Sequence, residues 1–392
     1  MSRGLLTGVT VLSLEQATTL PFLTYRLACD GARVIRIENA ERPDPNRFVG
    51  RDLLGEPGML SYFLPNNCGK EAITLNLGHA DGRALLRELI VKLGVDVFAS
   101  NQRTRNYGRL GIEAAELRAV KPDLIWLGIT GFGPGHDEAA YDPILQARAG
   151  FMALTGDAEG LPMAFGLPMV DLGAAEHGYS EVVKALYRRV TTGEGARIDV
   201  SMLASALSWM VSPVALSTSL GETVTRKGNR HQFFAPVDVY KTRDGHVFMA
   251  VGNDQQWAAL TALPRFVALG LPEYAANAGR IADVDRLNRE LSVRFAYLTT
   301  EEALESLRRA GIPVGRVPTL AEVTADPLVA PRLMEITDPR SGLRLKLPGP
   351  PAGQAPALSF PPRLGEHNEK IYGEALGLSA ERLAELRQQR IV

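Results

Sequence analysis

The residue of this sequence with the clearest chemical potential is Asp171, in the segment GLPMVDLGAA. The run LGAAEHG that follows it predicts a helix. The N-terminus of a helix favours an ionised carboxylate and offers backbone N–H groups to a developing oxyanion. An ionised aspartate there could attack an activated carbonyl carbon. By propensity alone it would more often serve as the N-cap of the helix, so both roles stay open at this point.

Other reactive residue types are thinly spread along the chain. The two cysteines, Cys29 and Cys68, and the six histidines form no CxxC, HxxxH or HxH pattern. Ligand spacing therefore predicts no metal site and no disulfide framework. The 43 Lys and Arg residues nearly balance the 44 Asp and Glu residues. This balance favours a small-molecule partner over nucleic acid or an anionic membrane surface.

The elements that must position these residues are predicted from hydrophobic patterning. Over the first 130 residues, helical stretches separate the strand-like runs VTVLSLE, RVIRIEN, AITLNL, VDVFASN and LIWLGITG. This alternation predicts an α/β fold with a large, doubly wound, Rossmann-like domain. Because the strands are nearly all apolar, we expect helices on both faces of a parallel sheet.

A ligand crevice is predicted at the carboxyl ends of these strands, where Glu15 to Ala17, Asn101 and Thr130 to Phe132 should lie. The first strand–helix turn, LEQATTLPF, lacks the glycines with which a dinucleotide-binding turn closes on a pyrophosphate. We therefore expect no nicotinamide cofactor.

The later part of the chain changes in character. The apolar run ASALSWMVSPVALSTSL, residues 204–220, is interpreted as a buried helix and not as a membrane span, because Ser and Pro interrupt it. Since the start of the chain also lacks the apolar run of a signal peptide, we expect a cytoplasmic protein. A hairpin is predicted around Asp244-Gly245 in VDVYKTRDGHVFMAVG.

Three parts of the chain follow from these patterns. The segment 327–362 is too rich in proline for a helix or a central strand and should be extended across another surface. Ser379 should cap a last helix. We predict a large domain over residues 1–224, a second, smaller α/β domain over 225–330, and a C-terminal segment, 331–392, that returns to the large domain.

Several segments, taken in order, resemble the family III CoA-transferases, which include formyl-CoA and carnitine CoA-transferase-like enzymes. They are VIRIE, NNCGKEAITLNL, ASNQRTRNYGRLGI, ITGFGPG, YDPILQARAGFMALTG, GLPMVDLGAA, TGEGARIDVSML, RKGNRHQFFAPVDVY and LGEHN. The resemblance covers essentially the whole chain. It implies that Asp171 is the nucleophile, which forms a mixed anhydride with the acyl group and then an aspartyl thioester with CoA.

The resemblance also implies where coenzyme A binds as an acyl-CoA substrate, with no permanently bound cofactor. The contacts carried over from the family are Gln16, Ala17, Leu75, Asn76, Asn101, Gln102, Arg109 and Leu110. Arg109 could pair with a phosphate. Asn39 replaces an arginine of the formyl-CoA branch, so we expect the missing phosphate contact to come from Arg36 or Arg42. The alternative for each basic residue is a solvated surface charge.

Tyr141 separates two chemistries of this superfamily, which also contains α-methylacyl-CoA racemase. The racemase branch carries a histidine before the aspartate that corresponds to Asp142, because proton transfer at the α-carbon needs a base. Tyrosine, with a reference pKa of about 10, is a poor base at neutral pH. Acyl exchange is therefore favoured over racemisation, and Tyr141 is expected to line the thioester pocket.

The second domain should supply a loop that keeps water from the anhydride. The candidates to hold a second carboxylate of the acceptor are Arg226, Asn229, Arg230 and His231, with Gly252 and Asn253 nearby. Their alternative role is a solvated linker between domains.

The function expected from the resemblance is transfer of CoA from a donor such as succinyl-CoA to a small acid, expected to be a dicarboxylate. Racemisation, and CoA binding without catalysis, are the alternatives. The resemblance also implies a homodimer in which two chains are interlocked.

Overall fold

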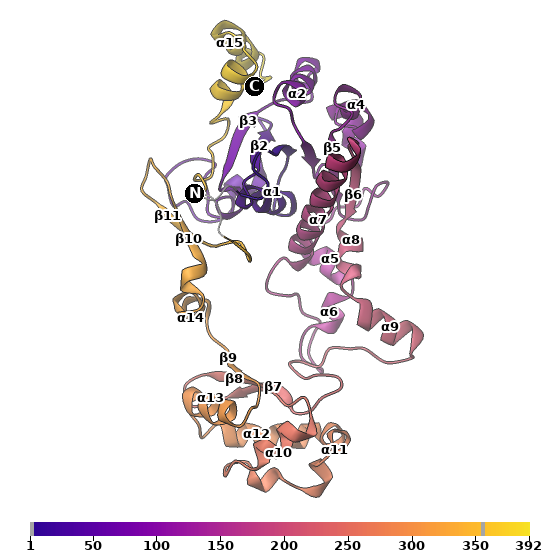
Figure 1. Ribbon diagram of the computed structural model, residues 1–392, viewed down its shortest axis with the longest axis vertical. Coiled ribbons are helices and arrows are strands. Elements are labelled where there is room, and N and C mark those ends of the chain that lie inside the picture. The colour runs from indigo at the N-terminus through magenta and orange to yellow at the C-terminus, as the bar shows by residue number, and fades with distance from the viewer. Residues whose placement is uncertain (1–3, 354–356) are drawn as a thin grey trace. The chain divides into compact units, whose positions relative to one another are not determined.

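The computed structural model describes residues 4–353 and 357–392. The chain forms two compact units, drawn in Figure 1. The first contains residues up to 149, 166–215 and 332–392, and the second contains 150–165 and 216–331. Each unit is described by itself below.

The first unit is built on a six-stranded parallel sheet with the strand order β3-β2-β1-β4-β5-β6. The strands are β1 (Thr10–Leu14), β2 (Arg33–Glu38), β3 (Lys70–Thr74), β4 (Val97–Ser100), β5 (Ile125–Thr130) and β6 (Arg197–Ser201). This order reverses direction between β1 and β4, which creates a crevice at the carboxyl ends of the strands. The predicted α/β class and doubly wound sheet are confirmed.

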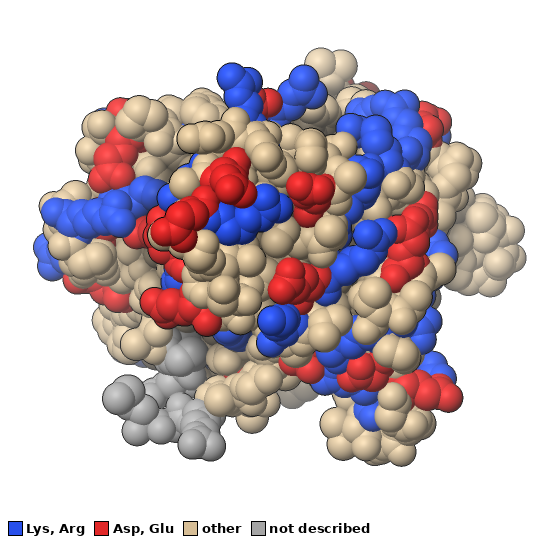
Figure 2. Space-filling model, turned by 90° about the horizontal axis from the view of Figure 1, so that it is seen from above, with Lys and Arg blue, Asp and Glu red and all other residues tan. Residues whose placement is uncertain are grey.

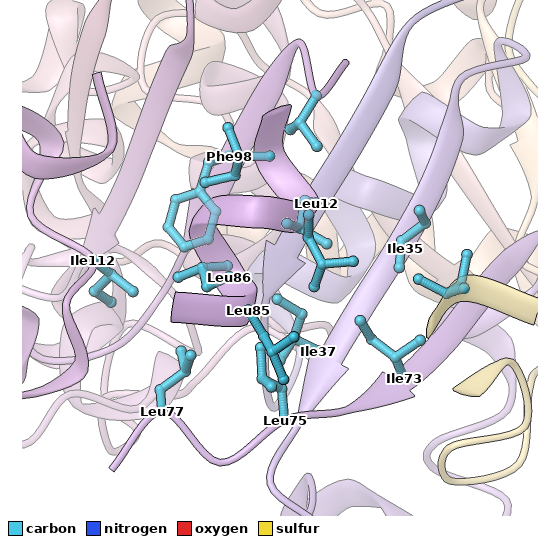
Figure 3. Packing of buried hydrophobic residues seen from close by; sticks show 14 of the residues in the cluster. Leu12, Ile35, Ile37, Ile73, Leu75, Leu77, Leu85, Leu86, Phe98 and Ile112 are labelled. Atoms are coloured by element: carbon cyan, nitrogen blue, oxygen red, sulfur yellow. The ribbon is translucent and has the colours of Figure 1, made fainter. Parts of the chain in front are cut away.

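Helices cover both faces of this sheet, as the apolar strands predicted. The helices are α1 (Thr19–Cys29), α2 (Ala80–Lys92), α3 (Tyr107–Leu110), α4 (Ala114–Val120), α5 (Asp142–Arg148), α7 (Met169–Thr192), α8 (Met202–Ser208) and α15 (Ala380–Gln388). On one face, Leu12 and Phe98 pack against Leu86 of α2 (Figure 3). On the other face α7 lies so close to α1 that a Cβ on Gly178 would come within 2.6 Å of Leu23.

The C-terminal residues pack on the first unit. Thr74, at the end of β3, accepts a hydrogen bond from the Tyr372 hydroxyl and donates its N–H to Asn368. Ser379 caps α15 as predicted, with its side chain accepting from Arg382 N. Within the expected extended segment, β10 (Leu333–Thr337) and β11 (Arg344–Pro348) form an antiparallel pair. Residues 354–356 of that segment lie outside the described residues.

The second unit contains a three-stranded antiparallel sheet, β7-β8-β9. Its elements include α6 (Phe151–Leu154), β7 (Val237–Lys241), β8 (His246–Ala250), α10 (Asp254–Thr261), α11 (Asn277–Ala282), α12 (Val284–Phe295), α13 (Thr300–Arg309), β9 (Val314–Arg316) and α14 (Leu320–Ala325). The hairpin predicted at Asp244-Gly245 joins β7 to β8. Trp257, Phe266 and Phe295 are among the side chains that fill the core of this unit.

The division between the units differs from the expected one, because residues 150–165 belong to the second unit. Backbone and side-chain hydrogen bonds explain this assignment. Gly228 N donates to Gly156 O at 2.8 Å, and the Arg226 guanidinium donates to the carbonyls of Asp157 and Gly160. Composition did not reveal this pairing, since the two segments are about 70 residues apart in the chain.

The expectation of one buried helix over residues 204–220 is wrong. The run contains α8 and a second helix, α9 (Val211–Ser219), which are bent by 75° relative to each other. Pro213 explains the break, because its ring excludes the carbonyl of Trp209 from a continuous helix. No residue of α9 is buried. Among the described residues, no single helix is long and apolar enough to cross a membrane.

Charges of both signs are interspersed on the face of the molecule shown in Figure 2. This face therefore carries no large patch of a single charge sign.

Candidate active site

A cavity of about 410 Å³ lies at the carboxyl ends of β1 to β4, where the sheet reverses its strand order. Six of the residues expected to contact coenzyme A line it, and they are Gln16, Leu75, Asn76, Gln102, Arg109 and Leu110. They come from the ends of β1 and β3 and from the segment after β4. Because parallel strands end at one edge of the sheet, residues far apart in the chain converge there.

Ala17 and Asn101 shape the turn beside this cavity. Asn101 holds the Gln16 backbone from both sides, since its side chain accepts from Gln16 N at 3.1 Å and donates to Gln16 O at 2.8 Å. Ala17 has a φ of 61°, a left-handed conformation that costs a non-glycine residue about 1 kcal/mol. Its N–H donates to Asp44 Oδ1 at 3.0 Å. The turn is therefore fixed by neighbours on two other loops.

Arg36 lies beneath the cavity and not in its lining, and the expectation that it binds a phosphate is wrong. Its side chain is fully buried and contacts carboxylates of Glu38 and Asp44, both at 3.1 Å. Arg36 occupies the middle of β2, a strand paired on both sides, and points to the face that α1 covers. A side chain in that place is closed off from a ligand in the crevice.

Arg36 belongs to a buried ionic network in which cations and carboxylates balance. Its other charged members are Glu15, Arg47 and Lys70, with Lys70 Nζ at 2.7 Å from Glu15 Oε1. Burial opposes the charged form of Glu38, but Arg36 and Arg47 outweigh it and lower the pKa of Glu38 to about 2. Burial lowers the pKa of Lys70 to about 8 against the opposing effect of Glu15. The network ties β1, β2 and β3 together under the cavity.

Arg42 and Arg109 are the cations that remain available at the cavity. Both line it and both are exposed. Within the part of the chain that the structure describes, neither side chain forms an ion pair. A phosphate approaching the cavity would therefore find these two guanidinium groups without a competing carboxylate partner.

Asp171 lies in the first turn of α7, as its third residue, and Pro168 occupies the N-cap position. Asp171 therefore does not cap the helix. Its Oδ1 accepts a hydrogen bond from Thr19 Oγ1 at 2.7 Å. Thr19 begins α1, directly after the Gln16 turn that borders the cavity. The carboxylate of Asp171 is thus bonded to a residue that lies three positions after Gln16, one of the expected CoA contacts.

The pKa of Asp171 is raised to about 6, chiefly by burial and further by the charge of Asp142, against the opposing hydrogen bond from Thr19. The helix N-terminus was expected to favour the ionised form, whereas burial and the charge of Asp142 act in the opposite direction. At pH 7 a carboxyl with a pKa of about 6 is still roughly nine-tenths ionised. The group is therefore both charged and unusually basic for a carboxylate.

Asp142 explains why the helix N–H groups do not stabilise Asp171. Its buried carboxylate accepts from Val170 N at 2.7 Å and from Asp171 N at 3.2 Å. Sequence reasoning missed both Asp142 and Thr19 as neighbours of Asp171. In the sequence, Asp142 could have been noticed because it directly follows Tyr141 in the family motif YDPILQA. Nothing in the sequence indicated that Thr19 would contact Asp171.

Tyr141 directly precedes α5 and is 72% exposed. It is not among the residues that line the cavity at the strand ends. Its neighbour Asp142, and not the tyrosine itself, contacts the first turn of α7.

The residues expected to hold the acceptor lie in the second unit, and most already have partners there. Arg230 lies 2.6 Å from Asp285 and 3.7 Å from Asp238. Arg226 is bound to backbone carbonyls, as described above. Both guanidinium groups therefore have protein partners within the second unit.

The other members of this set have local structural contacts or are exposed. His231 Nδ1 accepts from Phe233 N, and its ring stacks on Phe234 at 4.4 Å. Asn253 caps α10 by accepting from Gln256 N, and Gly252 N donates to the Gln256 side chain. Asn229 is exposed.

No cluster of three or more His, Cys, Asp or Glu side chains within residues 4–353 and 357–392 could hold a metal ion.

Comparisons with known proteins show the family of this chain. A model of CoA-transferase family III matches residues 6–368. The succinate–glutarate CoA-transferase of Agrobacterium fabrum is 30% identical over 391 residues, which cover 94% of this chain and 95% of that protein. The acetyl-CoA:oxalate CoA-transferase of Acetobacter aceti is 34% identical over 354 residues, which cover 89% of each protein.

A solved structure of similar fold is that of a CAIB/BAIF family protein from Brucella suis. It is 29% identical to this chain, with a TM-score of 0.83, and the match covers 95% of this chain and 100% of the other.

Proposed function

The chain belongs to CoA-transferase family III, and on that premise we propose that it moves CoA from an acyl-CoA donor such as succinyl-CoA to a small dicarboxylic acid, with Asp171 as the acyl carrier. The observation that carries the proposal is the Asp171 carboxylate, held at Oδ1 by Thr19 beside the turn that borders the cavity. Its raised pKa makes it a stronger nucleophile than an ordinary aspartate while leaving it largely ionised at pH 7.

The proposed reaction conserves the energy of the thioester through a series of acyl transfers. Asp171 attacks the carbonyl carbon of the donor, the CoA thiolate leaves, and a mixed anhydride forms. The thiolate then attacks the aspartyl carbonyl, which releases the donor acid and leaves an aspartyl-CoA thioester. The acceptor carboxylate opens this thioester, and the thiolate takes up the acceptor acyl group and regenerates Asp171.

Coenzyme A is proposed to bind along the cavity at the ends of β1 to β4, with Arg42 and Arg109 as its phosphate partners. Arg42 then takes the place that the arginine corresponding to Asn39 has in the formyl-CoA branch. The turn at Ala17, fixed by Asp44 and Asn101, leads in the chain from Gln16 at the cavity to Thr19, which bonds to Asp171.

The acceptor is proposed to be a dicarboxylate, because the relatives named above act on glutarate or oxalate. The residues proposed to bind its second carboxylate are those of the expected set, Arg226, Asn229, Arg230, His231, Gly252 and Asn253. We place the enzyme in the cytoplasm.

A homodimer with interlocked chains is part of this proposal. Large apolar side chains are exposed on the segment that includes Leu161 (83%) and Met163 (53%), and on α9, where Val211 is 73% exposed. Covering such side chains is a common reason for subunit association. A monomer in analytical ultracentrifugation under native conditions would argue against it.

Chemical trapping tests the proposed role of Asp171. The enzyme is incubated with acyl-CoA, hydroxylamine is added, and peptides are analysed by mass spectrometry. A hydroxamate at Asp171 that requires acyl-CoA is expected, and the Asp171→Asn variant provides the blank. A wild-type protein that binds acyl-CoA while Asp171 stays unmodified would contradict the proposal.

The substrates are identified by a matrix of succinyl-CoA, acetyl-CoA and formyl-CoA donors against mono- and dicarboxylic acceptors. The highest kcat/KM is expected for a dicarboxylate. Exchange of an α-deuterium from a branched acyl-CoA without any acceptor would instead indicate racemase chemistry.

A further inference from the structure

Helix α7 begins without a cap of its own. Pro168 at the N-cap position has no side-chain acceptor, yet the first N–H groups of a helix need partners. Asp142, at the start of α5, supplies them from outside the helix. One of its oxygens accepts from Val170 N and Asp171 N, and the other accepts from Gln146 Nε2 at 2.6 Å.

These hydrogen bonds to Asp142 affect which partners the Asp171 side chain can have. Its own backbone N–H is occupied by Asp142, so the carboxylate does not fold back onto the helix terminus. Across the two described ranges, Thr19 is the one hydrogen-bond donor to that carboxylate, and it binds Oδ1. Oδ2 is therefore the oxygen left for attack on an acyl carbon.

We propose that Asp142 and Thr19 are a pair of positioning residues for the proposed acyl transfer. Asp142 holds the backbone of Asp171 and withholds the helix N–H groups from its carboxylate, while Thr19 fixes Oδ1 and leaves Oδ2 to react. This inference rests on the proposed function, because it assigns roles relative to Asp171 as nucleophile.

The two residues act on the charge of Asp171 in opposite directions. The negative charge of Asp142 disfavours ionisation, whereas the Thr19 hydroxyl favours it. Removing Asp142's charge should therefore make Asp171 more acidic. Removing the Thr19 hydroxyl should make it less acidic.

Other charged groups on the elements around α7 have partners elsewhere. Arg26 on α1 pairs with Glu176 of α7 at 2.9 Å, Arg148 on α5 pairs with Glu138, and Arg197 on β6 pairs with Asp199. His177 on α7 bonds to Ser205 of α8. The helix α8 and the strand β5 carry no titratable side chain in MLASALS and IWLGIT.

The test compares pH profiles of kcat/KM for Asp142→Asn and Thr19→Val. Asparagine keeps an oxygen that can accept from the two backbone N–H groups, and valine matches the shape of threonine. The wild-type acid limb is expected near pH 6. Its midpoint should fall by about 0.5–1 pH unit in Asp142→Asn and rise by about the same amount in Thr19→Val.

The conservative Thr19→Ser variant should restore the wild-type midpoint. Glu116→Gln is the matched control, because it removes a carboxylate from the first turn of another helix, α4, and should leave the profile unchanged. Shifts in the same direction for both test variants, or lost activity with an unmoved midpoint, would show purely structural roles and overturn the inference.

Two further measurements distinguish a folding defect of a variant, and failure of the proposed function, from failure of the positioning roles. If Asp142→Asn does not fold, as judged by its thermal melt, the Thr19→Val midpoint decides alone, and an unchanged value overturns the inference. Trapping at Asp171 is run on the wild type in parallel. No acyl-dependent modification there would reject the proposed function itself, whereas normal trapping with unmoved profiles would reject only the positioning roles.

Discussion

Two groups of carboxylates in the same unit, one fully buried and one half-buried, have pKa values shifted in opposite directions. Under the cavity, Glu15, Glu38 and Asp44 are matched by Arg36, Arg47 and Lys70, and cations lower the pKa values of Glu15 and Glu38 despite burial. At the start of α7, Asp171 faces another carboxylate and one hydroxyl, and its pKa is raised to about 6.

The difference teaches that burial alone does not decide what a carboxylate does. Burial raises the pKa in both places, and the partner decides the outcome. A matched set of charges stabilises the frame of the cavity. A carboxylate without a cation partner, such as that of Asp171, lowers the free energy of unfolding. Its raised pKa makes its oxygens more basic and more nucleophilic. This contrast is tested most directly by variants that remove the Asp171 carboxylate or the cation partners of the other group.

The largest effect is expected for Asp171→Asn on activity. The amide cannot form the mixed anhydride, so kcat should fall by at least about 10³-fold, as is typical when a nucleophile is removed. Steady-state CoA transfer measures this loss, and acyl-CoA affinity by calorimetry serves as the control for an intact cavity. Activity within about tenfold of wild type would exclude Asp171 as the acyl carrier.

The next largest effect is expected when the matched set is broken by Arg36→Met. The change leaves carboxylates of Glu38 and Asp44 buried with one cation fewer, which should lower the free energy of unfolding by about 3–5 kcal/mol. Urea denaturation measures it. Arg33→Met, on the same strand but with an exposed ion pair to Glu71, should cost less than about 1 kcal/mol.

A smaller effect of opposite sign is expected for the stability of Asp171→Asn. The folded-state pKa of Asp171 lies above its unfolded value, so the charged form disfavours folding once the pH exceeds about 4, and the penalty is complete above about pH 6. The variant should be more stable than wild type by about 1–3 kcal/mol at pH 7.5.

The gain should shrink as the pH falls from about 6 toward 4, because the wild-type carboxyl then becomes protonated in both states. Thermal melts of the two proteins over this range measure it. An advantage for Asp171→Asn that does not depend on pH would show that the cause is packing and not ionisation.

The smallest effects are expected at the rim of the cavity. Arg42→Ala and Arg109→Ala should each raise the KM for acyl-CoA by about 5–10-fold with little change in kcat, because an exposed charge-assisted contact is lost. The difference in KM between each variant and the wild type should diminish at high ionic strength. Arg87→Ala, which removes a surface pair with Glu116, is the control and should leave KM unaltered.

Local pattern predicted some parts of the molecule well. Continuous apolar runs with helices between them indicated the doubly wound sheet, and Asp244-Gly245 indicated the β7–β8 hairpin. The motif around Asp171 placed that residue at the beginning of a helix. Since the carboxyl ends of parallel strands meet at one edge, six of the predicted CoA contacts, from Gln16 to Leu110, converge on one cavity.

Sequence patterns did not predict the role of a side chain where that role depends on its partner in the folded protein. Arg36 and Arg42 look alike in the sequence, but one is locked among carboxylates and the other is exposed at the rim. Arg226 and Arg230 contact backbone carbonyls and aspartates, partners that the sequence did not indicate. Spacing along the chain carries no information about such pairings.

The sequence by itself determined the sheet, the helix that carries Asp171 and the family to which the chain belongs. Only the tertiary structure decided the state of Asp171, because its two controlling neighbours, Thr19 and Asp142, lie 152 and 29 residues away in the chain. Electrostatic effects on a carboxylate depend on distances through space and on burial, and both arise only when the chain is folded.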